Sequence, residues 1–166
     1  DHYFWGQSER ISPEAPVPVI NISNQSKSLG GAGNVINNLS SLGAIVDIVS
    51  VIGQCQTSIE LKDLLSEIGI DSRYLITQKG RITSKKTRVI AAQQQVARYD
   101  HESTEEIDKK SQDLILKIFK ENISKYDIVL LSDYGKGVLT SNLTESIIEI
   151  ANINNKKILV DPKGKD

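Results

Sequence analysis

The spacing of apolar residues along the chain predicts alternating helices and strands. In residues 35–42 and 59–68 the apolar positions follow the 3.6-residue period of a helix, and a glycine comes directly after each pattern. Residues 44–53 form a mostly apolar run rich in Val and Ile, which is typical of a buried parallel strand. Later, the stretches YDIVLLSD and KKILVDP each predict a strand, and a helical pattern separates them.

Two segments do not fit this alternation. Three prolines between residues 13 and 18 exclude a long helix near the start, and apolar and polar residues alternate there as on an edge strand. Residues 71–100 contain three short strand patterns separated by turns. We therefore predict that residues 4–25 and 73–100 pair into a small β-strand lid, apart from a core of residues 26–72 and 101–166.

A helix is predicted to follow the lid. Ser103 or Thr104 is a suitable cap, Glu105 and Glu106 suit the first turn, and the helical spacing continues to about Asn122. Strands and helices thus alternate on both sides of the lid segment. This order predicts an α/β fold, with a Rossmann-like parallel sheet that has helices on both faces, plus the small β-strand lid.

Composition and charge exclude several classes of protein. A chain with 39% hydrophobic and 25% charged residues is typical of a soluble globular domain. Its net charge of −1 gives no basic field for nucleic acid, and no apolar run approaches the roughly 20 residues of a membrane helix. With Cys55 as the single cysteine and two isolated histidines, we expect neither a disulfide nor a metal site, and a cytoplasmic protein.

The ends of the sequence predict a fragment. The chain starts at Asp1 and contains no methionine, and it stops directly after a strand pattern, where an α/β protein normally continues.

Polar clusters follow the predicted strands. In parallel α/β sheets, ligands bind beyond the carboxyl ends of the strands. Asp1, the stretch SDYGKG with Asp133, and the stretch DPKG with Asp161 all fall at such positions. A single Asp there often caps a turn, but three clusters in equivalent places favour a binding site.

The glycine-rich turn before the first helix contains Gly30, Gly31 and Gly33, followed by Asn34. It lacks the Lys-Ser/Thr of a P-loop and the third glycine of a dinucleotide fingerprint. The Asn34 amide both donates and accepts hydrogen bonds, which suits a hydroxyl-rich ligand better than a phosphate. Tight packing of the helix on a strand remains the alternative.

Basic residues alternate along the predicted lid strands. Lys86 and Arg88 lie two residues apart and so share one face, as do Arg98 and Asp100. Such cations suit an anionic substrate, and a charged, solvated edge strand is an equally good reading.

Together, LGGAGNV, KTRV…RYD, LLSDYGKG and DPKG resemble the ribokinase-like (PfkB) carbohydrate kinases. Within that family, RISPEAPVPV and SDYGKGVLT are similar to the kinase part of heptose 7-phosphate kinase/heptose 1-phosphate adenylyltransferase proteins. The match runs over essentially all 166 residues. The resemblance implies a lid over a sugar site, a lid that often mediates dimerisation, and a glycine turn that contacts the sugar.

The resemblance also implies the ligands. It implies transfer of a phosphoryl group from ATP, with Mg²⁺, to the C1 hydroxyl of D-glycero-D-manno-heptose 7-phosphate. The expected partners are this phosphorylated sugar and a second copy bound through the lid, without nucleic acid or membrane. The residues expected at the sugar are Asp1, Gly30, Gly31, Asn34 and Asp133, and those expected at phosphates are Lys86, Arg88, Arg98, Lys136 and Lys163.

The chain departs from the family pattern at both ends. Family members begin with a strand before the position of Asp1, and they continue with an N…E motif and a GAGD motif that supplies the catalytic base and an anion hole. These do not occur in this chain, so we assign no catalytic residue and expect the isolated chain to lack turnover. The alternatives are another ribokinase-like sugar kinase, or a non-catalytic sugar-binding or dimerisation module.

Overall fold

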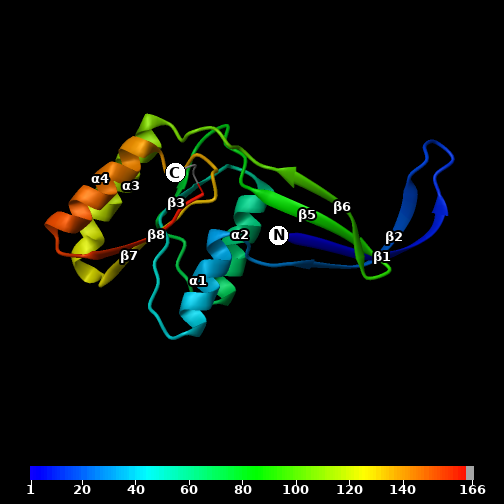
Figure 1. The fold of residues 1–166 in the computed structure, drawn as a ribbon, viewed down its shortest axis with the longest axis horizontal. Coiled ribbons are helices and arrows are strands. Elements are labelled where there is room, and N and C mark those ends of the chain that lie inside the picture. Colours follow the sequence, from blue (N-terminus) through cyan, green and yellow to red (C-terminus); the bar gives the residue numbers. More distant parts are fainter. Residues whose placement is uncertain (164–166) are drawn as a thin grey trace.

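The computed structural model describes residues 1–163 and shows a helix-covered core from which a β-sheet projects (Figure 1). Cores of this kind form where apolar strand residues are covered by the apolar stripes of helices. The elements in chain order are β1 (His2–Ile11), β2 (Pro18–Lys27), α1 (Ala32–Ser41), β3 (Ser50–Ile52), α2 (Gln56–Glu67), β4 (Leu75–Thr77), β5 (Lys85–Ala91), β6 (Gln94–His101), α3 (Lys109–Asn122), a 3₁₀ turn (Ile123–Lys125), β7 (Ile128–Ser132), α4 (Ser141–Ile153) and β8 (Lys157–Asp161).

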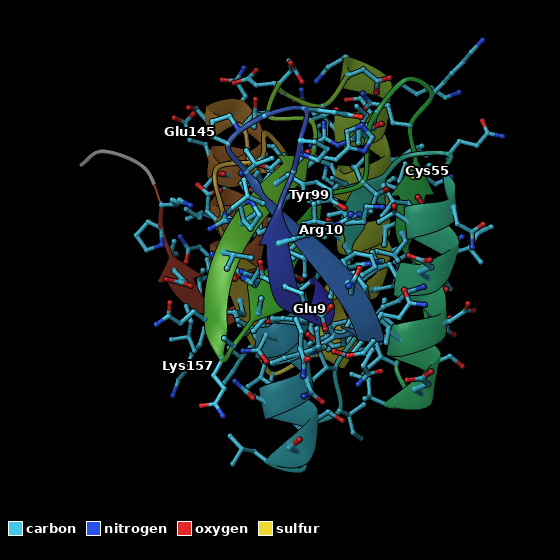
Figure 2. All side chains as sticks on the ribbon, turned by 90° about the vertical axis from the view of Figure 1, so that its right-hand side faces the viewer. Glu9, Arg10, Cys55, Tyr99, Glu145 and Lys157 are labelled. Carbon is cyan, nitrogen blue, oxygen red and sulfur yellow. The ribbon has the colours of Figure 1, made fainter. Side chains whose placement is uncertain are left out.

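The lid is a four-stranded sheet in the order β2-β1-β5-β6. β1 is antiparallel to β2 and parallel to β5, and β5 turns back into β6 through Ala92 and Gln93, both at positive φ. β1 pairs with β5 only from His2 to Gly6. Beyond Gly6, β1 and β2 continue as a two-stranded ribbon, which projects to the right in Figure 1. Figure 2 faces this end of the molecule and labels Glu9 and Arg10 on the ribbon.

One part of the predicted lid belongs to the core. Residues 75–77, inside the predicted lid segment 73–100, form β4, which pairs in parallel with β3. The reason is burial: Leu75 is 8% exposed and packs with Ile52 and Leu65. Burying the apolar side chains of a strand under core helices removes more apolar surface from water, and so stabilises the fold more, than placing the strand in a half-exposed sheet. The second lid segment therefore begins with β5.

Helices cover both faces of the core strands, as predicted. Val51 of β3 packs in one apolar cluster with Ile115 of α3 and Ile147 of α4. The next residue, Ile52, points to the opposite cluster, which contains Ile36 of α1 and Leu65 of α2. This alternation is the period of a strand buried on both faces. The predicted α/β fold class is confirmed.

The core strands are shorter than the apolar run predicted. Of residues 44–53, only Ser50–Ile52 are a regular strand, because β3 finds its parallel partner in the three-residue strand β4. Among the described residues, β3–β4 and β7–β8 form separate parallel pairs. A run of apolar residues becomes a strand only where a neighbour satisfies its backbone hydrogen bonds.

The helix after the lid begins later than predicted. α3 starts at Lys109, and the Asp108 side chain caps it by accepting a hydrogen bond from the Ser111 nitrogen at 2.7 Å. Neither Ser103 nor Thr104 is the cap. Residues 103–107 instead form an irregular segment before the helix, and the Ile107 nitrogen donates to the Gly137 carbonyl at 2.9 Å. Ile107 is 2% exposed, so burial of its side chain fixes this crossing segment.

Membrane-spanning helices are not found in the described part of the chain. Within residues 1–163, each helix is too short or too polar to reach across a bilayer.

Candidate functional site

The carboxylate of Asp1 lies against the glycine-rich turn. A Cβ atom placed on Gly30 would be 2.3 Å from Oδ2 of Asp1, so the carboxylate occupies space that a side chain at position 30 would fill. Oδ1 accepts from Nη1 of Arg88 on β5 at 2.8 Å. The two side chains are only 16% and 21% exposed. The site therefore begins with a half-buried ion pair between the start of the lid and its third strand.

An aromatic pair supports this ion pair from the lid side. The guanidinium of Arg88 lies over the ring of Tyr3, 5.3 Å from its centroid. Tyr3 in turn stacks on Trp5, with ring centroids 6.2 Å apart. Stacking on an aromatic face restricts the Arg88 side chain, so its orientation toward Asp1 is fixed from two sides.

The glycine turn is backed by the loop of residues 133–137. Gly31 has φ 51° and ψ −128°, a backbone conformation that favours glycine, and its missing Cβ would lie 3.5 Å from the ring of Tyr134. Asn34 follows in the first turn of α1, where its nitrogen donates to the Gly31 carbonyl and its side chain is exposed. The glycine turn that precedes Asn34 thus lies against Tyr134, the neighbour of Asp133 in its loop.

Asp133 also has a role within its own loop. Its Oδ1 accepts from the Gly135 nitrogen at 2.7 Å, and its nitrogen donates to the Asp161 carbonyl at 2.9 Å. Gly135 packs near Lys163, whose Cδ lies 3.6 Å from the position of a Cβ. The ends of β7 and β8 are therefore adjacent, as the equivalent positions of their Asp residues predicted. Gly164 of DPKG lies outside the described residues.

The predicted lid cations are held by carboxylates. Asp100 accepts from Lys86 at 2.9 Å and from Arg98 through two hydrogen bonds of 2.9 and 2.7 Å. Glu102 accepts from Lys86 at 3.2 Å through Oε2 and from Lys136 through Oε1. Burial raises the pKa of Glu102, but the hydrogen bonds from the two lysines outweigh it, and the pKa lies below its usual range.

A buried arginine anchors the loop that carries Lys136. Arg81 is 8% exposed, and its guanidinium donates to the backbone carbonyls of Glu105, at 3.2 Å, and Lys136. Burial lowers the pKa of Arg81. The loop of residues 133–137 is thereby tied to the crossing segment between lid and core.

The structure brings most of the predicted site residues into these contacts. Asp1, Gly30 and Arg88 meet directly, whereas Asn34 and Asp133 lie on adjacent segments whose shared use stays a prediction. Sequence reasoning missed Tyr134, Arg81 and Glu102. For Glu102 a signal existed, since residues 98, 100 and 102 share one face if the strand period is continued. For Arg81 none existed, because its burial depends on tertiary contacts.

The acidic and basic groups of this site suit hydroxyl-rich and anionic ligands. Carboxylates and amides accept and donate hydrogen bonds to hydroxyls, and ammonium groups bind phosphate oxygens. Within residues 1–163, no group of three histidine, cysteine or acidic side chains is arranged to hold a metal ion.

Curated proteins that are similar to this chain include several bifunctional HldE proteins. The chain is 57% identical over its whole length to the bifunctional protein HldE of Aliarcobacter butzleri, and 47% identical to that of Helicobacter pylori. It covers 35% and 36% of the lengths of these two proteins. The chain therefore spans about a third of the length of the curated relatives it matches.

Solved structures share the fold at low sequence identity. A ribokinase of Cryptococcus neoformans in complex with ADP is 16% identical, with a TM-score of 0.63 over 98% of this chain and 46% of its own. An Arabidopsis thaliana ribokinase complexed with ribose and ATP is 11% identical, with a TM-score of 0.63 over 99% of this chain and 50% of its own.

The sequence profile of the pfkB family of carbohydrate kinases matches residues 2–166. The match includes the glycine turn, the lid strands and the loop of residues 133–137 that form the site. This chain belongs to the pfkB carbohydrate kinase family.

Proposed function

We propose that this chain is the sugar-binding part of an ATP-dependent kinase that phosphorylates D-glycero-D-manno-heptose 7-phosphate at C1, in ADP-heptose and lipopolysaccharide core synthesis. Identity to two bifunctional HldE proteins supports the assignment. One observation carries it: the Asp1 carboxylate rests on Gly30 and is held by Arg88 of the lid, beside the loop that carries Asp133. That arrangement offers fixed acceptors to a hydroxyl-rich ligand beneath a basic sheet.

In this proposal the chain positions the sugar. Asp1, Asn34 and Asp133 bind sugar hydroxyls, and the hydrogen bond from Arg88 orients the Asp1 carboxylate. ATP, bound with Mg²⁺, supplies the phosphoryl group, and such transfer depends largely on positioning and on stabilisation of charge. We assign neither the catalytic base nor a metal ligand to the described residues.

A substrate panel tests this function in the longer protein. We expect coupled ADP release to be fastest with the heptose 7-phosphate, and phosphorus NMR to show a new phosphate ester at C1. A preference for ribose or for a fructose phosphate would instead select another ribokinase-like kinase. Absence of turnover with every sugar, despite sugar binding, would select the non-catalytic module.

The isolated chain is expected to bind the sugar phosphate without turning it over. Its residues supply contacts to the sugar, but the base motif of the family does not occur in its sequence. The same coupled assay, run with the chain of 166 residues, checks this expectation. Turnover comparable to that of the longer protein would show that the catalytic residues lie within this chain.

We also infer that two copies associate through the lid. In the described part of the chain no third strand pairs with the ribbon beyond Gly6, and isolated two-stranded ribbons are marginally stable in water. The lid as a whole nevertheless exposes large apolar side chains, a property typical of interaction surfaces. On the lid these are Trp5 (41% exposed), Ile11 (63%), Val17 (51%), Ile22 (46%), Val96 (45%) and Tyr99 (53%).

Sedimentation velocity tests the dimer. We expect a dimer for the unmodified chain and a monomer for the double variant Ile11→Ser, Val17→Ser. Ile45→Ser is the matched control, because Ile45 is 97% exposed but lies outside the lid. The control is expected to remain dimeric, and a monomeric unmodified chain would contradict the inference.

A further inference from the structure

The carboxylate of Glu60 on α2 binds the two strands at which the lid begins. Its Oε2 lies 3.2 Å from Nε2 of His2 on β1, and its Oε1 accepts from Nζ of Lys27 on β2 at 2.5 Å. His2 and Lys27 lie directly opposite each other in the antiparallel ladder of these strands. In Figure 1 the start of β1, marked N, lies beside α2. We call the contacts of Glu60 with His2 and Lys27 the Glu60 bridge.

The core fixes the position of Glu60. Leu65 of the same helix is fully buried. The hydroxyl of Ser58, also buried, donates to the Gly53 carbonyl at 2.6 Å and lies 2.8 Å from the hydroxyl of Thr83. Glu60 lies between Ser58 and Leu65 along α2. Its carboxylate is therefore presented to the lid by a helix that is anchored in the core on both sides of it.

The bridge is stable at neutral pH without a charged histidine. The hydrogen bond from Lys27 lowers the pKa of Glu60 and outweighs burial, so the carboxylate is ionised. Burial lowers the pKa of His2 although the charge of Glu60 opposes this, so the imidazole is neutral at pH 7 and donates through Nε2–H. The side chains of His2 and Glu60 are only 15% and 20% exposed, so water competes weakly for their contact.

Glu60 acts on the Asp1 side chain from the opposite face of the lid. Successive side chains of an extended chain point to opposite faces. His2 accordingly faces Glu60, whereas Asp1 faces Gly30 and Arg88. A rotation at the start of β1 that breaks the contact between His2 and Glu60 therefore also turns the Asp1 carboxylate away from the glycine turn.

The second partner of Glu60 leads into the glycine turn. Lys27 is the last residue of β2, and the next residue, Ser28, pairs with Asp1. The Ser28 nitrogen donates to the Asp1 carbonyl at 3.0 Å, and the Asp1 nitrogen donates to the Ser28 carbonyl at 2.9 Å. Gly30 follows soon after in the chain. Glu60 therefore holds both sides of the contact between the Asp1 carboxylate and Gly30.

We propose that Glu60 is a positioning residue of the sugar site, which keeps the Asp1 carboxylate aligned with the glycine turn through His2 and Lys27. The sugar as ligand of Asp1 rests on the function proposed above. The alignment itself rests on contacts within the chain.

Steady-state kinetics of the longer protein tests the proposal. Glu60→Ala frees the start of β1, so we expect KM for the heptose phosphate to rise about three- to tenfold, with KM for ATP and kcat nearly constant. A merely structural role would instead lower the thermal midpoint and the fraction of active enzyme, and hence kcat, and would leave both KM values unchanged. That outcome would overturn the proposal.

A charge exchange separates the bridge from the mere loss of a side chain. Glu60→Lys places two ammonium groups together and should raise KM for the sugar at least as much as Glu60→Ala. The double variant Glu60→Lys, Lys27→Glu restores opposite charges, so this KM should return to within about threefold of the unmodified value. A double variant as weak as Glu60→Lys alone would contradict the proposed role of the bridge.

Glu67→Ala is the matched control. Glu67 is also a glutamate of α2, but it is exposed at the end of the helix. Its replacement removes the same charge from the same helix and should change neither KM. A rise in KM for the sugar equal to that of Glu60→Ala would show a general effect of charge and overturn the assignment.

A second variant keeps the proposal testable if Glu60→Ala does not fold. Lys27 is 40% exposed, so Lys27→Met is expected to fold. In the chain without ligand, the NMR signal of the Arg88 guanidinium, which donates to Asp1, should shift in Lys27→Met. It should not shift in Lys62→Met, which removes an exposed lysine of α2. An unchanged Arg88 signal in Lys27→Met would overturn the proposal.

The two readouts separate this proposal from the proposed function. If the unmodified longer protein neither binds nor phosphorylates the heptose phosphate, the proposed function fails. The Arg88 signal still decides whether the Glu60 bridge aligns Asp1, because that measurement needs no sugar.

Discussion

Asn34 and Asp133 belong to different elements, and each offers hydrogen bonds to a sugar hydroxyl. In the longer enzyme, Asn34→Ala should raise KM for the heptose phosphate by about two- to tenfold, since an uncharged hydrogen bond contributes ~0.5–1.5 kcal/mol. KM for ATP should stay nearly constant. Steady-state kinetics with each substrate varied in turn measures both values.

The control for this prediction is Asn38→Ala. Asn38 is likewise exposed on α1, one turn further from the glycine turn. It should change neither KM. If Asn34→Ala weakened ATP and spared the sugar, the glycine turn would be a nucleotide cradle.

Asp133→Ala should weaken sugar binding more than Asn34→Ala does, because hydrogen bonds to an ionised group contribute up to ~3 kcal/mol. Asp133 also accepts from the Gly135 nitrogen, so the variant should lower the thermal midpoint of the chain as well. Sugar titration and thermal unfolding separate these two effects. A lower midpoint with unchanged sugar affinity would leave Asp133 with a turn-forming role alone.

At single positions, the sequence predicts which residues belong to the candidate site better than it predicts the contacts that they make. Asp1, Gly30 and Arg88 were identified from residue type and motif, and the structure places them in contact. No sequence pattern indicates that Asp1 and Arg88 pair, because Asp1 precedes β1, Arg88 lies on β5, and the order of these strands in the sheet depends on tertiary contacts. Glu102 was missed because the strand pattern was ended at Asp100.

Among the elements, the crossing segment of residues 103–107 depends on a glycine in the neighbouring loop. Gly137 has φ 71°, and a Cβ there would lie 2.1 Å from the Glu105 carbonyl oxygen. Gly137→Ala should therefore destabilise the chain by more than the ~1–2 kcal/mol of a left-handed residue alone. Chemical denaturation of the chain measures the loss.

Gly43→Ala isolates the backbone contribution. Gly43 after α1 has φ 88°, and nothing lies within 4 Å of an added Cβ. The difference between the losses in unfolding free energy of Gly137→Ala and Gly43→Ala is then the free energy needed to move the crossing segment. Equal losses would show that the segment adapts without cost.

Element ends were predicted well where local chemistry decides them. α1 and α2 end beside Gly43 and Gly69, both at positive φ, and β5 and β6 fall within two of the predicted strand stretches. The start of α3 was wrong because suitable capping residues occur twice, at 103–104 and at Asp108. Burial of Ile107 between loops, which local sequence does not reveal, selects the second.

At the scale of the whole molecule, a polar cluster joins the two halves of the core. The Asp47 carboxylate, ahead of β3, accepts from Arg73 at 2.7 Å and from the hydroxyl of Tyr126, which follows α3. Burial and the hydrogen bond to Asp47 raise the pKa of Tyr126 to about 12. Tyr126→Phe should lower stability by ~1 kcal/mol at neutral pH.

The contribution of Tyr126 to stability is expected to decrease at alkaline pH. The folded chain holds the Tyr126 proton more tightly than the unfolded chain does, so the contribution is complete below pH 10 and is lost between pH 10 and about 12. The stability difference between the unmodified chain and Tyr126→Phe should therefore shrink over that range. Tyr99→Phe, at an exposed position of β6, should show no such change.

The order of strands in the lid has a consequence for how the chain folds. β1 and β5 lie side by side, but α1, β3, α2 and β4 separate them along the sequence. A parallel pair with a long crossover gains its hydrogen bonds only after the entropy of closing that loop has been lost. We therefore expect the core helices to form first and the lid to close in a slower phase. Because Asp1 meets Gly30 and Arg88 only when β1 has joined β5, sugar-binding ability should appear with that slow phase in a stopped-flow refolding experiment, after most of the helical signal has recovered.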